Sequence, residues 1–234
     1  MLTVEPEAIH PALWRAAQLA RSSVRTVPAG DKSLSLELPG GGWPIGTLVE
    51  MLVQQPGIGE LSLLRPALLA SVTRPIALVM PPHTPQAHAL ANWGIAPERL
   101  MWIRAQRTAD VLWATEQLLR AGTCSAVLLW QQHVRNDALR RLNLAAQSGE
   151  TFFCMVRPLA CARDASPAPL RVAVAPAAGG VELTFIKRRG PQRDEPLFVP
   201  LTPSPILLHR HAVPVDLPAP APLVPRSVPA ELVH

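Results

Sequence analysis

The sequence predicts an α/β protein: a mostly parallel sheet flanked by helices, with an antiparallel hairpin at the sheet edge and a Pro-rich disordered C-terminal tail. Three observations favour this fold. Short apolar runs alternate with helical patterns between residues 48 and 157, which is typical of βαβ units. Two segments of alternating polarity follow at 170–175 and 181–187 and are joined by a Gly-containing turn. Nine prolines then fall between residues 200 and 234.

These patterns divide the 234-residue chain into three parts. We expect an N-terminal helix and linker over residues 1–29, the α/β core over residues 30–198, and a flexible tail over residues 199–234. The core is long enough to bury a sizeable apolar interior as one domain.

The elements of the core are predicted in order from periodicity and from Gly and Pro punctuation. The alternation of Leu34 to Leu38 indicates a half-buried strand. A helix follows residue 60, and Pro66 is expected to kink or delay it unless it lies in the first turn. Buried strands are expected at 48–53, 75–80, 100–103, 125–130 and 151–156, and helices at 8–22, 84–93, 108–121 and 136–147.

Composition limits the class of protein and its compartment. The net charge of +5, from 22 basic and 17 acidic residues, permits contact with nucleic acid or an acidic protein face but demonstrates neither. Cys124, Cys154 and Cys161 form no C-x-x-C pair, so we expect buried free thiols in a reducing cytoplasm. No apolar run reaches the roughly 18 residues of a membrane span, and the first ten residues do not form a signal peptide.

The stretch after the strand at 48–53 occupies the place of a phosphate-binding loop. A working loop reads G-x-x-x-x-G-K-[ST]. Here two glycines remain, but an anion replaces the lysine and an apolar side chain replaces the hydroxyl that would hold magnesium. A carboxylate repels a triphosphate, so the nucleotide chemistry of this loop is predicted to be lost. The altered loop comprises Gln54, Pro56, Gly57, Gly59, Glu60 and Leu61.

Several segments carry a family resemblance. The stretches 32–36 and 41–50 resemble the entry to the ATPase core of the RecA recombinases, and this similarity covers roughly residues 30–157. The whole chain resembles the ImuA family of RecA-like accessory proteins of bacterial mutagenic translesion synthesis. The segment 141–149, followed by Phe152-Phe153 and Val156-Arg157-Pro158, is the most telling, and it also resembles the cell-division inhibitor SulA.

The resemblance also locates the catalytic positions of the recombinases. Their lysine and threonine fall at Glu60 and Leu61, their water-orienting glutamate at about Pro82, and their magnesium-binding aspartate at about Trp130. Loss of all four groups removes what phosphoryl transfer uses, so no enzyme activity, no cofactor and no metal are expected. Trp130 is predicted to plug the vacated nucleotide crevice.

By resemblance, the protein is a scaffold of SOS-induced translesion synthesis, nucleoid-associated when recruited. Its partners are the polymerase-like protein ImuB and, through it, a mutagenic DNA polymerase and the sliding clamp. Contact with a RecA filament or with itself is a further expectation. The alternative is a SulA-like division inhibitor that binds the tubulin-like ring protein. A recombinase-type ATPase or a DNA-binding module is the second alternative.

Two further groups of residues have open interpretations. The basic cluster Lys187, Arg188, Arg189 and Arg193 is either a solvated strand end or a contact for phosphates or an acidic partner. Scattered apolar residues in the tail belong either to a plain linker or to a docking segment, and these are Ile206, Leu207, Leu208, Leu223 and Val224. The tryptophans are expected in the core, except Trp43, which follows the glycines.

Overall fold

The computed structural model describes residues 25–70, 74–191 and 193–202. Within these residues a mixed sheet of eight strands has the order β10-β9-β8-β3-β7-β6-β4-β5, and a separate antiparallel pair joins β1 (Thr26–Pro28) to β2 (Gly42–Pro44). The predicted helix at 8–22 and most of the predicted tail lie outside the described residues.

The parallel part of the sheet confirms the predicted alternation of strands and helices. Its central strand is β3 (Leu48–Val53), which pairs in parallel with both β7 and β8. The further strands are β4 (Ile76–Val79), β5 (Leu100–Ile103), β6 (Ala126–Trp130) and β7 (Phe152–Pro158). Their residues are nearly all apolar because helices cover both faces of the sheet.

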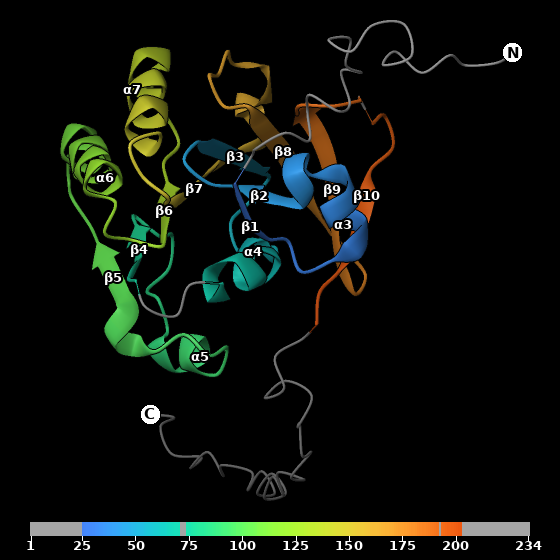
Figure 1. Ribbon diagram of the computed structural model, residues 1–234, viewed down its shortest axis with the longest axis horizontal. Coiled ribbons are helices and arrows are strands. Elements are labelled where there is room, and N and C mark those ends of the chain that lie inside the picture. Colours follow the sequence, from blue (N-terminus) through green and yellow to red (C-terminus); the bar gives the residue numbers. More distant parts are fainter. Residues whose placement is uncertain (1–24, 71–73, 192, 203–234) are drawn as a thin grey trace, which may run out of the picture. The chain divides into compact units, whose positions relative to one another are not determined.

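The helices form two layers around this sheet (Figure 1). On one face, α6 (Thr108–Ala121) and α7 (Asn136–Ala146) pack against alternate strand residues such as Val127 and Leu129. On the other face, α3 (Lys32–Glu37), α4 (Glu60–Leu69) and α5 (Ala87–Ala91) contribute buried residues to the same core cluster as Ala126 and Leu128. Single-turn 3-10 helices lie at η1 (Pro39–Gly41), η2 (Pro97–Arg99) and η3 (Leu159–Arg163).

The antiparallel hairpin is present, but it is not the last element of the sheet. Strands β8 (Leu170–Ala177) and β9 (Gly180–Lys187) pair around a tight turn, as predicted. A strand that was not predicted, β10 (Leu197–Pro200), then pairs with β9 and forms the edge. The ordered core therefore continues through Pro200 and not only to residue 198, because Val199 pairs with Val181. At the start of the core, β1 lies inside the predicted linker.

Four local predictions differ from the structure. The segment 34–38 is not a strand, because Lys32–Glu37 forms a helix whose N-cap, Asp31, accepts a 2.8 Å hydrogen bond from the Leu34 amide. Pro66 lies inside a helix that continues through it to Leu69. Trp43 is fully buried against the core, where its ring tilts towards that of Phe152 with a centroid distance of 6.4 Å. By contrast, Trp102 and Trp113 are exposed.

Candidate functional site

The altered phosphate loop lies between β3 and α4, at the carboxyl edge of the parallel strands, where ligands bind in open α/β sheets. Gly57 and Gly59 have positive φ angles of 89° and 114°, so the backbone conformation that favours glycine is retained. The loop is also covered by the chain itself. A Cβ atom on Gly59 would lie 2.7 Å from Cδ1 of Leu201, which places the residues after β10 directly against this loop.

Glu60 begins α4 and points its carboxylate back into the loop. Its Oε1 accepts a 2.7 Å hydrogen bond from the backbone amide of Gly57, and the residue is only 3% exposed. Backbone amides at a loop and helix start normally bind anions. Here the anion is a side chain of the same loop. Leu61, at the position of the lost hydroxyl, packs against the apolar core.

Trp130 and Pro82, at the other lost positions, line two cavities at the same edge. The larger, of about 470 Å³, also borders Gln54, Pro56 and Arg157. The smaller, of about 210 Å³, also borders Gly57, Glu60 and Leu61. Trp130 is 8% exposed, and its indole Nε1 has no hydrogen-bond partner among the described residues. Trp130 thus borders both cavities, and its role as a plug of the crevice stays a prediction.

A buried ionic cluster lies beside this edge and was missed by the sequence analysis. Glu50, in the middle of β3, is fully buried, and its carboxylate accepts hydrogen bonds from Arg157 Nη1 at 3.1 Å and Arg171 Nε at 2.6 Å. Arg157 comes from β7 and Arg171 from β8, the two neighbours of β3. The one available signal was a glutamate inside an otherwise apolar strand, since buried charges are nearly always paired.

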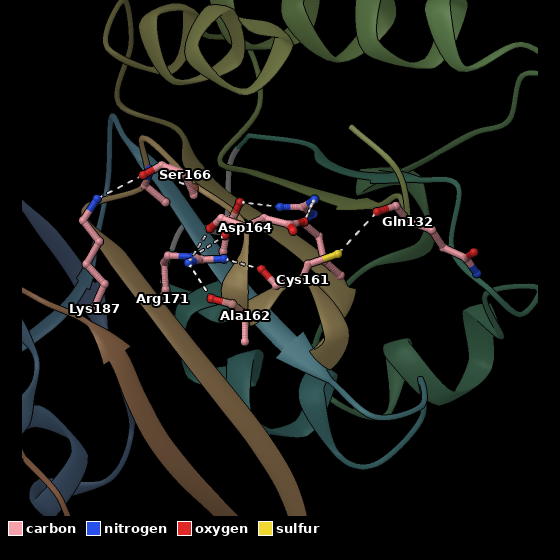
Figure 2. Close-up of polar contacts among 10 residues, drawn as sticks. Gln132, Cys161, Ala162, Asp164, Ser166, Arg171 and Lys187 are labelled. Atoms are coloured by element: carbon pink, nitrogen blue, oxygen red, sulfur yellow. Dashed lines mark hydrogen bonds and ion pairs between the residues drawn. The ribbon is translucent and has the colours of Figure 1, made fainter. Parts of the chain in front are cut away.

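The same cluster holds η3 against the sheet. Figure 2 shows the Arg171 guanidinium directed at the segment from Cys161 to Asp164. Its Nη2 donates to the Cys161 carbonyl at 2.8 Å, and its Nη1 donates to the carbonyls of Ala162 and Asp164 at 3.1 Å each. Arg157 also contacts the Asp164 carboxylate at 3.4 Å. Because Arg157 lines the larger cavity, this network fixes one of its walls.

Most of the predicted basic cluster is engaged within the protein. Lys187 donates to the Ser166 carbonyl at 3.0 Å (Figure 2). Arg188 and Arg193 both pair with the Glu37 carboxylate, Arg193 at 2.7 Å, and the Arg188 guanidinium lies 4.8 Å from the Phe185 ring centroid. The hydrogen bond from Arg188 holds the pKa of Glu37 below its usual value.

Arg189 is the exception in this cluster. It is exposed, and in the part of the chain that the structure describes it has no polar partner. It lines a cavity at the amino edge of the sheet together with Arg25.

Several other titratable groups are either buried or paired with residues of the same protein. The three cysteines are free and buried, as predicted, and desolvation raises the pKa of the Cys124 and Cys161 thiols, which lowers the fraction of reactive thiolate. Glu116 is 6% exposed and pairs with Arg120 at 2.7 Å and Arg141 at 2.5 Å. Glu150 is exposed and pairs with Arg25.

The remaining predictions about sites concern residues that the structure does not describe. The docking residues Ile206, Leu207, Leu208, Leu223 and Val224 lie outside the described residues. In the described ranges, no group of three or more His, Cys, Asp and Glu side chains is arranged to hold a metal ion, and no helix is long and apolar enough to cross a membrane.

The fold and this loop define the class of protein: a mostly parallel α/β protein whose phosphate loop is occupied by its own carboxylate. No family model matches the chain. It is similar to the cell division inhibitor SulA of Edwardsiella piscicida, with 32% identity over 108 residues, which are 45% of this chain and 62% of the relative. The chain thus spans about three-fifths of the curated relative's length. This similarity supports a SulA-related family, and the finer resemblance to ImuA stays a prediction.

Proposed function

We propose that this protein is a non-catalytic, protein-binding accessory factor of SOS-induced mutagenic translesion synthesis. The observation that carries the proposal is the hydrogen bond from the Gly57 amide to Glu60. The Gly57 amide that already donates to a carboxylate is not free to bind a triphosphate, and the carboxylate repels one. Leu61, Pro82 and Trp130 supply none of the groups that phosphoryl transfer uses.

Exposed apolar side chains at the free sheet edge support a role in protein binding. Strand β5 is the last strand of the sheet and pairs only with β4 among the described strands. Met101 and Trp102 on this strand are 38% and 46% exposed, and Trp113 on α6 is 62% exposed. Tryptophan is enriched at the centres of protein interfaces. By the family resemblance, the partners are the ImuB polymerase-like protein and, through it, a mutagenic polymerase and the sliding clamp, with self-association or a RecA filament as further contacts.

Direct binding between purified proteins tests this proposal. The full chain, immobilised on a sensor surface, is expected to bind the ImuB-like protein, and Trp102→Ala should weaken binding more than Leu36→Ala, a control that removes another exposed apolar side chain. Absence of binding to ImuB-like protein would contradict the translesion role. Turnover of Mg-ATP by the same preparation would contradict the non-catalytic role, independently of any partner.

The similarity to SulA favours a second candidate, a division inhibitor that binds the tubulin-like ring protein. This candidate predicts that the purified chain suppresses GTP-dependent polymerisation of the ring protein, measured by light scattering. The translesion proposal predicts no effect in that assay. The two functions are therefore separated by two measurements on one preparation.

A further inference from the structure

A cavity of about 310 Å³ lies at the amino edge of the parallel sheet, opposite the altered phosphate loop. Its walls come from the turn before β3, the end of α7 and the start of β8. Arg25 and Arg189 provide its charge, and Gln147 adds an amide. Pro44, Ile45 and Leu170 form apolar walls. The cavity therefore combines cationic groups with an apolar surface, and it does not overlap the surface used in the proposed function.

The charges around this cavity favour an anionic ligand. Among the described residues, Arg189 has no polar partner, whereas its neighbours Lys187 and Arg188 are held by protein groups. Arg25 pairs with the exposed carboxylate of Glu150. The charged residues that line the cavity are both arginines, so the lining itself carries only positive charge.

We propose that this cavity binds a phosphate group, either of single-stranded DNA or of a free nucleotide. A planar guanidinium pairs with phosphate oxygens through two parallel hydrogen bonds. The apolar walls suit the sugar or base attached to that phosphate, because contact with them removes apolar surface of the ligand from water. Glu150 competes with the ligand for Arg25, so it limits the affinity of the free protein.

Fluorescence anisotropy with a labelled twelve-residue oligothymidylate tests the site at low salt. Arg189→Gln is expected to weaken binding by roughly three- to tenfold, as for loss of a partly exposed charged hydrogen bond. Glu150→Gln should strengthen binding, because it releases Arg25. Arg163→Gln removes the same charge from an exposed position on η3 and serves as the matched control. Circular dichroism establishes that each variant is folded.

Competitors identify the source of the phosphate. Displacement by thymidine monophosphate or inorganic phosphate indicates a mononucleotide site, and displacement by the unlabelled oligonucleotide alone indicates nucleic acid. Both results support a phosphate site. The proposal is overturned if none of these ligands binds, if Arg189→Gln and Arg163→Gln weaken binding equally, or if polyglutamate displaces the oligonucleotide better than oligothymidylate itself.

Discussion

The backbone amide of Gly57 donates a 2.7 Å hydrogen bond to the carboxylate of Glu60, three residues further along the chain. Glu60 also stands at the start of α4, where a negative charge is favourable. The Glu60 side chain thus supplies an internal anion for the backbone of this loop. Its hydrogen bond supports the positive-φ conformation of Gly57.

Glu60→Ala is expected to lower the free energy of unfolding by about 1–2 kcal/mol, because the Gly57 amide loses its charged acceptor. Glu60→Gln keeps an acceptor oxygen at the same place and should cost less. Urea denaturation of the two variants and the parent protein measures the difference. An equal loss in both variants would mean that the charge, and not the hydrogen bond, holds the loop.

Trp130→Ala is expected to enlarge the two cavities that Trp130 lines and to destabilise the protein by about 3 kcal/mol, as for other large-to-small core changes. Trp130→Phe is the matched control and should cost roughly 1 kcal/mol, because it keeps most of the ring and removes an indole N–H that has no partner in the described structure. Thermal unfolding compares the variants. If alanine costs no more than phenylalanine, Trp130 does not act as a plug.

The parallel strands could be predicted from the sequence because their signal is local. Strands such as β3 and β6 are buried on both faces, so each is a short apolar run. The strand predicted at 34–38 was wrong, because leucines at alternate positions fit a strand as well as they fit a short helix. In the structure, Leu34 and Leu38 are buried and Leu36 is 88% exposed, which fits the helical spacing of four residues and the cap at Asp31.

The ionic cluster and β10 could not be predicted because their contacts are not local. Glu50 is separated from Arg157 by 107 positions and from Arg171 by 121. Only the strand order places them together. Likewise, β10 is a segment of four residues that follows Pro196 and ends at Pro200. It forms a strand because its backbone pairs with the edge of β9. The altered loop could be identified from the sequence because residues 54–61 are contiguous, whereas the hydrogen bond between Gly57 and Glu60 required the backbone geometry.

Glu50→Ala is expected to destabilise the fold by about 3–5 kcal/mol, because it leaves two buried guanidinium groups without their shared carboxylate. Asp164→Asn serves as the control. Its side chain is 55% exposed and contacts the same Arg157, so the loss should be below about 1 kcal/mol. Chemical denaturation gives both values. Similar losses at the two positions would show that burial does not set the strength of this cluster.

Acidification is expected to weaken the attachment of α3 to the strand end at β9. The hydrogen bond from Arg188 lowers the pKa of Glu37 below its ordinary value of 4.5, and Arg193 makes a smaller contribution in the same direction. A group whose pKa is lowered in the folded state stabilises the protein at pH values above its unfolded-state pKa. This contribution is lost as the pH falls through the folded-state pKa. Glu37→Gln should therefore reduce the stability of the protein at pH 7 and flatten its pH dependence below about pH 4.5. Glu182→Gln, at an exposed position on β9, should leave both unchanged. Urea denaturation between about pH 3 and about pH 7 measures the difference. These limits lie roughly one and a half units below and more than two units above the ordinary carboxyl pKa of 4.5. Parallel stability curves for the parent protein and Glu37→Gln would contradict the role of this ion pair.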